Sequence, residues 1–424
     1  MKSITASSSS TFLPNFTSTS SSSSSSPFSP PSFSKSPSSP SRFICQTNPN
    51  PNLPLILHTA LQSSGTDITH AKAAREGFCN QIKKLSDIER NISISINRRV
   101  DLARAALCIA AEDDALVSHS SVPLPVSSFV ERLDDLSMGF CSHYSSSFNS
   151  SPEVFLENLE KYLYGYKGFR RATVSVLPES QALYLHSVLT HRAGSAAMLS
   201  LIYSEILKML RLWGLLNFEA EIYCPHDEVN LPKGYHKLKS RISDQAHILT
   251  TQSLLVEILK SLKEAFWPFR SDAGSSLFLR AAWAAKCTSG PNMVEETGFE
   301  RAASKAAQHR LERGIWTSVR LGDMRRALSA SERLILLDHN VDELRDYSIL
   351  LYHCGFYKES LHYLNLYKDS TSSLVQRRST SKLKKLEDDA VEELKTRLNL
   401  IMMEDNWSRP SNFKNYLENL SEPW

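Results

Sequence analysis

The N-terminal segment of the chain has almost no charged side chains. Its first 45 residues carry only Lys2, Lys35 and Arg42, and no acidic residue occurs before Asp67. Serine dominates instead, in runs such as residues 21–26. A charge-poor, serine-rich segment is typical of an organelle transit peptide. We therefore expect residues 1–45 to be a transit peptide, and residues 46–70, rich in Pro, Asn and Ser, to be a disordered linker.

The scarcity of arginine in this segment also bears on the target organelle. A mitochondrial presequence usually carries several arginines on an amphipathic helix, whereas this segment has only Arg42. The chloroplast stroma is therefore the predicted location, with the mitochondrion as the alternative. Cleavage is expected near residues 44–46, where the composition begins to change. A disordered tail without a targeting role is the remaining interpretation.

The rest of the chain lacks a net charge. Without the three N-terminal cations, 45 of the 48 Lys and Arg residues remain against 45 Asp and Glu residues. Such a balance leaves no field that would attract nucleic acid. We therefore expect no nucleic acid partner.

The sequence also lacks paired cysteines and long apolar runs. Its 7 cysteines are scattered, without a C-x-x-C pair, which favours buried thiols in a reducing compartment. The longest apolar helix candidate, residues 196–216, contains Glu205, Lys208 and Arg211. These charges argue against a membrane span. We expect a soluble protein, and we expect neither a cofactor nor a metal.

Apolar residues at helical spacing predict a mostly α fold with an α+β core over residues 71–269. The segments with this spacing are residues 98–112, 126–136, 152–163, 180–189, 196–212 and 250–266. Ser151 followed by Pro152 is a helix start signal. One strand, residues 218–223, alternates apolar and polar side chains and predicts a small sheet.

Three stretches of the sequence resemble the SirB transglutaminase-like family of bacteria and plastids. They are residues 102–107, residues 164–169 and the V-L-x-x-R-x-G turn with the helix that follows it, residues 188–203. The resemblance covers about residues 98–225 and 310–370. It implies a core like that of papain and transglutaminases, followed by tetratricopeptide-like helices.

The resemblance also implies where catalytic residues would lie. In that fold a cysteine at the start of the central helix is activated by the helix dipole, and a histidine on a following strand accepts its proton. Here the helix start contains Ser195 and no cysteine, while Cys224 and His226 follow the predicted strand. Residues 230–247 lack the Asp-Pro-Phe pattern expected for the third partner. The catalytic set is therefore incomplete.

Each of these candidates has a structural interpretation, which we favour. Ser195 is expected to cap the helix, Cys224 to be a buried thiol, and His226 to be a surface or capping histidine. Arg192 is expected to anchor the turn through carbonyls at the end of the preceding helix, with carboxylate binding as the alternative. A cluster with metal-binding side chains consists of Cys224, His226, His236 and His247. Its spacing matches no zinc site.

A repeat follows a loop-rich connection over residues 270–300. Five residues, Trp316, Leu321, Gly322, Ala327 and Leu334, recur 33 positions later as Ile349, Cys354, Gly355, Ser360 and Tyr367. This displacement is close to the tetratricopeptide period of roughly 34 residues and predicts helical hairpins over residues 301–370. Gly322 and Gly355 are expected at close helix crossings, and Ala327 and Ser360 are the small residues of the second helices.

The last segment, residues 371–424, is expected to be a charged C-terminal helix and tail. Its cations and acids nearly cancel, which favours a solvated helix, with a partner-binding coil as the alternative. For the whole chain, the sequence favours a plastid protein-interaction or scaffold module on a catalytically degenerate transglutaminase-like core. The alternative is a hydrolase or transferase using Ser195 or Cys224 with His226. The protein partner is not identifiable from the sequence.

The transit-peptide interpretation predicts where the native chain begins. We expect the mature protein to start between about residues 40 and 70, because the acid-free, serine-rich segment precedes that interval. Edman sequencing of the protein purified from its own cells measures the start directly. A native chain that retains the serine run at residues 21–26 would contradict the transit peptide.

Overall fold

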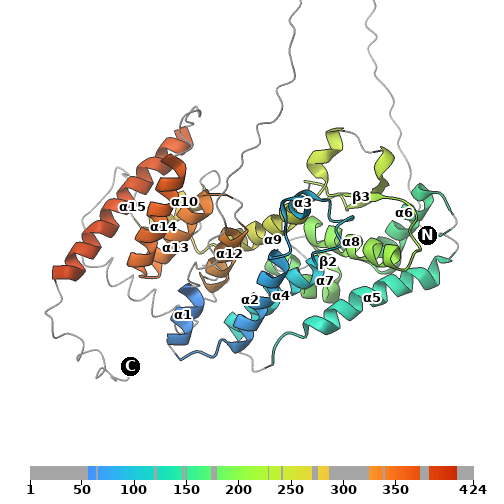
Figure 1. Cartoon of the computed structure of the whole chain (residues 1–424), viewed down its shortest axis with the longest axis horizontal. Coiled ribbons are helices and arrows are strands. Elements are labelled where there is room, and N and C mark those ends of the chain that lie inside the picture. Colours follow the sequence, from blue (N-terminus) through green and yellow to red (C-terminus); the bar gives the residue numbers. More distant parts are fainter. Residues whose placement is uncertain are drawn as a thin grey trace, which may run out of the picture. The chain divides into compact units, whose positions relative to one another are not determined.

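Helices make up most of the structure, and strands contribute two small sheets, so the predicted mostly α fold with a small sheet is confirmed. The computed structural model describes residues 56–407 except 64, 119–121, 146–147, 149, 173–178, 228, 240–241, 270–275, 286–323, 338–339 and 373–381. Figure 1 shows the order of the elements.

The elements before the hairpin sheet are α1 (Ile56–Ser63), α2 (Thr69–Ile82), α3 (Asp87–Asn91), α4 (Leu102–Ser118), α5 (Val126–His143), α6 (Pro152–Glu160), the π-helix η2 (Lys161–Tyr166), β1 (Arg170–Arg171), the 3-10 helix η3 (Glu179–Leu183), α7 (Leu185–His191), β2 (Ala193–Gly194) and α8 (Ala196–Leu212). Those that follow are β3 (Ala220–Tyr223), β4 (Lys233–His236), the 3-10 helices η4 (Lys237–Lys239) and η5 (Ile242–His247), α9 (Thr251–Ala265), α10 (Leu277–Ala284), α12 (Met324–Leu336), α13 (Asp342–His353), α14 (Tyr357–Ser372) and α15 (Lys382–Trp407).

Helix starts follow the capping signals in the sequence. The Ser151 hydroxyl accepts a hydrogen bond from the Val154 amide, and Pro152 is the first residue of α6. Thr250 and Ser253 form a capping box at the start of α9. These caps satisfy amides that have no partner within the helix, so the predicted starts of α6 and α9 are confirmed within a residue or two.

Helices α2 and α4 lie side by side at the centre of the N-terminal part. Both faces of α4 are buried, and this alanine-rich helix allows α2 to approach closely. A Cβ atom on Gly77 of α2 would lie 2.8 Å from the sulfur of Cys108, which is too close for a side chain. A larger residue at position 77 would therefore force the Cys108 side chain to move.

The two-stranded sheet of β3 and β4 packs against α8 and α6. β3 and β4 pair antiparallel, from Ala220 opposite His236 to Tyr223 opposite Lys233. Gly234 on β4 packs against α6 and α8, where an added Cβ would lie 2.9 Å from Cδ2 of Leu156. The strand predicted over residues 218–223 is thus confirmed, and it begins two residues later, at Ala220.

Three segment predictions were wrong. Residues 46–70 are not all linker, because α1 and the first turn of α2 lie there and Leu57 and Leu61 of α1 are buried. The loop-rich connection over residues 270–300 contains α10, whose Phe278 is fully buried. In each case short apolar helices gain stability from tertiary packing that local composition does not reveal.

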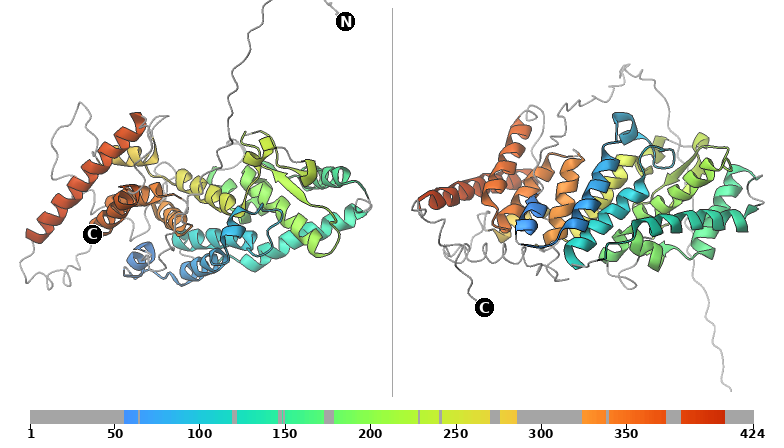
Figure 2. Two further views of the ribbon diagram at one scale, coloured as in Figure 1. Left: turned by 45° about the horizontal axis from the view of Figure 1, so that its top comes forward. Right: turned by 60° about the horizontal axis from the view of Figure 1, so that its bottom comes forward.

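The third error concerns α15, which is not a solvated helix. It packs against α14 and α10 (Figure 2). Its apolar face is buried through Ala390, Val391, Leu394 and Leu398. The described elements of the expected core and of the expected hairpins all belong to one compact unit of the chain.

In the described residues, α13 and α14 pack against each other as a helical hairpin, and one role predicted in this region is corrected. Ser360 of α14 lies at the crossing with α13, where its hydroxyl donates to the Ser348 carbonyl at 2.8 Å, and Ala327 of α12 is fully buried. Gly355 lies instead in the turn after α13, with φ of 83°. Its amide donates to the Tyr352 carbonyl, which is the geometry of a helix-ending glycine and not of a helix crossing. Trp316 and Gly322 lie outside the described residues.

The carboxylate of Glu112 on α4 is the centre of a fully buried polar network. Arg75 of α2 and Arg333 of α12 donate to it, at 2.7 Å from Nε of Arg75 and 2.9 Å from Nη2 of Arg333. His58 of α1 and Ser329 of α12 each lie 3.0 Å from the same carboxylate. Three helices of the N-terminal part, α1, α2 and α4, therefore share one buried anion with α12, which is more than 200 residues away in sequence.

Electrostatics keep that anion charged. Burial raises the pKa of the Glu112 carboxyl, but the guanidinium groups of Arg333 and Arg75 outweigh burial and hold the pKa well below its usual range. A carboxyl with a depressed pKa in the folded state stabilises the fold above its unfolded pKa of about 4.3. That contribution is lost as the pH falls through the folded pKa.

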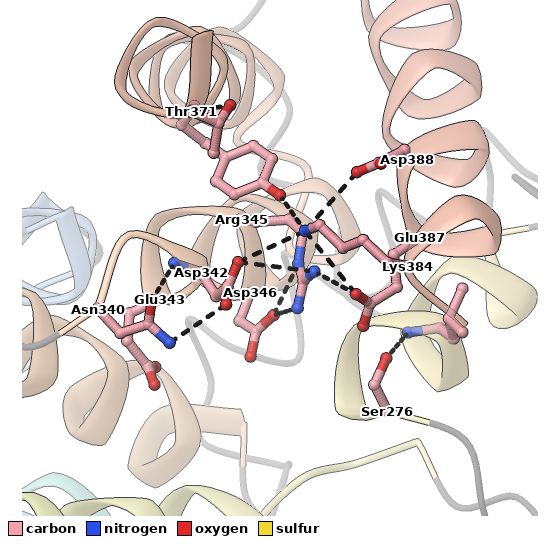
Figure 3. A network of polar contacts seen from close by, with 12 residues as sticks. Ser276, Asn340, Asp342, Glu343, Arg345, Asp346, Thr371, Lys384, Glu387 and Asp388 are labelled. Atoms are coloured by element: carbon pink, nitrogen blue, oxygen red, sulfur yellow. Dashed lines mark hydrogen bonds and ion pairs between the residues drawn. The ribbon is translucent and has the colours of Figure 1, made fainter. Parts of the chain in front are cut away.

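A second buried network attaches α15 to α13. Figure 3 shows Arg345 between Asp346 and Glu387, at 3.0 Å from each carboxylate. Lys384 of α15 lies 3.8 Å from Asp342 of α13. The charges of the C-terminal helix are thus paired with the hairpin and not only with one another.

Replacing Glu112 by glutamine should reduce the free energy of unfolding by about 3–5 kcal/mol, because it leaves two buried arginines without their central anion. Urea unfolding followed by far-UV circular dichroism measures the change. Glu157→Gln is the matched control, since Glu157 pairs with Lys161 on the surface, and it should cost less than about 1 kcal/mol. Equal losses for the two variants would show that Glu112 has no special role.

Candidate functional site

The turn that precedes α8 explains the V-L-x-x-R-x-G pattern. Arg192 ends α7 in the left-handed region, with φ of 56°, and its amide donates to the Val188 carbonyl. Two residues later, a Cβ on Gly194 would lie 2.7 Å from both γ-carbons of Val188. Strand β2 therefore passes so close to α7 that only glycine fits.

The Arg192 side chain anchors this turn through a different carbonyl from the one we predicted. Its Nη1 donates to the carbonyl oxygen of Lys167 at 2.9 Å. Lys167 follows η2 and does not belong to the preceding helix α7. The guanidinium thus ties the turn before α8 to the segment that leads into β1.

Ser195 is the N-cap of α8. Its hydroxyl oxygen accepts a hydrogen bond from the Met198 amide at 3.3 Å, and its backbone is extended, with ψ of 163°. This is the geometry that satisfies an otherwise unpaired helical amide. The Ser195 oxygen is therefore oriented toward its own helix.

Cys224 is buried in a position that does not activate its thiol. It follows β3, and its amide donates to the His247 carbonyl at 2.9 Å. Burial raises the pKa of the Cys224 thiol, and the neighbouring Ser200 hydroxyl opposes this only in part. Ser200 is five residues into α8, about 7.5 Å along the helix from Ser195. The thiol thus lies beside the helix and not at its positive end.

His226 is exposed and lies next to a second histidine. Its ring centroid is 4.7 Å from that of His247, which stacks on Tyr223 at 4.5 Å. The adjacent carboxylate, Asp227, accepts hydrogen bonds from the side-chain amide and the backbone amide of Asn230 and from the Val229 amide, and these bonds lower its pKa. Asp227 therefore stabilises its own turn, and no hydrogen bond joins it to His226 in the described part of the chain.

The four side chains of the Cys224, His226, His236 and His247 cluster do not converge. His236 pairs with Ala220 at the far end of the hairpin, whereas Cys224 follows Tyr223 at the near end. Four strand residues separate these positions, which is about 13 Å. Among the residues that the structure describes, no group of three His, Cys, Asp or Glu side chains has a geometry that could hold a metal ion.

Sequence reasoning missed the buried acidic pair of α4. Glu112 and Asp113 interrupt an apolar helix, and Asp113 accepts a hydrogen bond from Tyr184 at 2.8 Å and from Arg333 at 2.7 Å. Adjacent acids on a helix with two apolar faces were a visible signal of burial with a partner. The partner itself is 221 residues from Glu112 in sequence, and the local pattern does not reveal it.

The fold and the site together define a helical protein whose long buried helix α8 follows a glycine turn and leads into a β-hairpin. A family model of the transglutaminase-like superfamily matches residues 127–213, from α5 to the residue after α8. The chain therefore contains a transglutaminase-like domain. The matched segment includes Ser195 but neither Cys224 nor His226.

No curated protein sequence and no solved structure gives a significant match to the chain. Within the described residues, every helix is too short or too polar to cross a membrane.

The cap geometry predicts the effect of changing Ser195. Ser195→Ala should reduce the free energy of unfolding by about 0.5–2 kcal/mol, and Ser195→Asp should restore most of it, because aspartate also accepts from the helical amides. Thermal unfolding measures both variants, with Ser151→Ala as a matched N-cap control on α6. Partner capture and other cellular functions should survive Ser195→Asp. A functional loss in Ser195→Asp at unchanged stability would instead assign chemistry to the hydroxyl.

Proposed function

We propose that this protein is a protein-interaction module of the plastid stroma, built on a transglutaminase-like core that has lost its catalytic set. The observation that carries the proposal is the start of α8, where Ser195 caps the helix and no thiol lies at the positive end of the dipole. SirB-like ancestry and tetratricopeptide-like repeats, both suggested by the sequence, are part of the proposal.

The remaining catalytic candidates support the same conclusion. Thiol catalysis needs a thiolate close to a base that is held by a third group. Burial disfavours the thiolate of Cys224. The Asp227 carboxylate accepts hydrogen bonds within its own turn. The geometry of these residues favours packing and capping roles over acyl transfer.

The C-terminal helices offer a surface for a protein partner. Beyond its buried face, α15 carries Leu400 and Met403, which are 56% and 66% exposed, and Leu383 and Leu386, which are 43% and 58% exposed. Each pair is spaced i, i+3, so its two side chains lie on one side of the helix. Paired exposed apolar side chains on a firmly docked helix suit a partner with an apolar groove or helix.

The proposed surface is tested by charge substitution. The double variant Leu400→Glu with Met403→Glu should reduce partner capture from plastid stroma about tenfold, because burying the new carboxylates at an interface is unfavourable. Quantitative mass spectrometry of affinity captures measures this. Ile88→Glu is the control, since Ile88 is 72% exposed on α3, and it should capture the same proteins as the wild type. Equal capture by all three proteins would remove α15 from the proposed surface.

The hydrolase alternative is tested separately with covalent probes. A fluorophosphonate that labels Ser195 stoichiometrically, or an iodoacetamide that labels Cys224 in the folded protein, would support catalysis and contradict the proposal. Absence of labelling at both residues, together with rapid alkylation of Cys224 after unfolding, is the expected result, because burial disfavours its thiolate.

A further inference from the structure

Three cations line one small cleft beside the turn that precedes α8. The cleft has a volume of about 170 Å³ and is lined by Arg132, Asp135, Leu136, Lys167, Phe169, Leu189 and Arg192. The residues come from α5, from the segment after η2 and from the end of α7. None of the protein-interaction features on α15 belongs to this cleft.

Neutral groups of the protein hold the three cations in place. Nη2 of Arg132 donates to the Leu189 carbonyl at 3.0 Å, and Nη1 of Arg192 donates to the Lys167 carbonyl at 2.9 Å. Nζ of Lys167 lies over the ring of Tyr162, 5.3 Å from its centroid. A carbonyl or an aromatic ring orients a cation without neutralising its charge.

The cations have no carboxylate partner of their own. In the part of the chain that the structure describes, Arg132, Lys167 and Arg192 form no ion pair, although Asp135 lines the same cleft. Three cations and one carboxylate leave an excess of two positive charges. Guanidinium groups have several donors each, so donors remain after the carbonyl contacts are made.

The size and the walls of the cleft restrict what it could hold. Its volume is below the roughly 300–1,000 Å³ of sites for drug-sized ligands. Phe169 and Leu189 are buried and form an apolar wall of the cleft beside the cations. A single oxyanion with few carbon atoms attached suits such a site.

We propose that this cleft is a binding site for a phosphate dianion, either inorganic phosphate or a small organic phosphate monoester. A phosphate monoester carries a charge of about −1.5 to −2 at pH 7 and three acceptor oxygens. This charge matches the excess of two cations, and arginine pairs suit tetrahedral oxyanions. Arg192 then has a second role beside holding the turn, and the site is independent of the proposed protein-interaction surface.

Isothermal titration calorimetry of the folded protein at low ionic strength tests the proposal. The titrants are inorganic phosphate, glycerol 3-phosphate and succinate, a dicarboxylate of equal charge. Arg132→Gln should weaken phosphate binding about tenfold, since one hydrogen bond to a charged group is lost. Asp135→Asn should tighten it, because the repelling carboxylate is removed. Tighter binding of glycerol 3-phosphate than of phosphate would identify the monoester as the ligand, and equal binding would identify the free ion.

Lys161→Gln is the matched control, because Lys161 is an exposed cation on η2 whose partner is Glu157 and which lies outside the cleft. It should leave the affinity unchanged, and thermal unfolding should show that all variants are folded. The proposal is overturned if the wild type binds no phosphate, if Lys161→Gln weakens binding as much as Arg132→Gln does, or if succinate binds as tightly as phosphate.

Discussion

The arrangement of the helices depends on the hydrogen bonds and ion pairs of the buried Glu112 carboxylate. This carboxylate receives hydrogen bonds from α2 and α12 and lies beside His58 of α1. A buried ion group of this kind adds little net stability compared with apolar packing, but any other docking of these helices would leave charges buried and unpaired. We infer that the network specifies how α12 docks against α2 and α4, more than it adds to stability.

The same network also holds α1 in place. The Leu57 amide donates to Glu332 and His58 contacts Glu112, so α1 is part of the same buried network. A leader that ends near Cys45, as the sequence predicts, leaves α1 in the mature chain. The network in Figure 3 holds α15 in a similar way, because Arg345 of α13 pairs with Glu387 of α15. Helices α1 and α15 are therefore both held by buried polar contacts to helices that are distant in sequence.

The polar groups around α8 form a different arrangement. Ser195 caps its own helix, Cys224 is buried beside Ser200, and Asp227 closes a turn. Each group is satisfied locally, whereas catalysis needs them aimed at a shared reacting atom. The exposed apolar pairs lie on α15, and the cations Arg132, Lys167 and Arg192 line a separate cleft. Recognition is thus better supported than reaction.

The sequence by itself determined the helices and their starts, because caps and apolar spacing act over a few residues. Ser151 with Pro152, Thr250 and the turn before Ser195 were all readable in this way. It also indicated the transglutaminase-like domain. The local pattern failed for α1, α10 and the buried face of α15, which are stabilised by packing against distant helices. Gly355 was placed at a helix crossing because its spacing is the same for a crossing and for a helix end, and only its positive φ separates them. The partners of Glu112 were decided by the tertiary structure alone, since a hydrogen bond across 221 residues depends on how whole helices dock and not on any neighbouring residue.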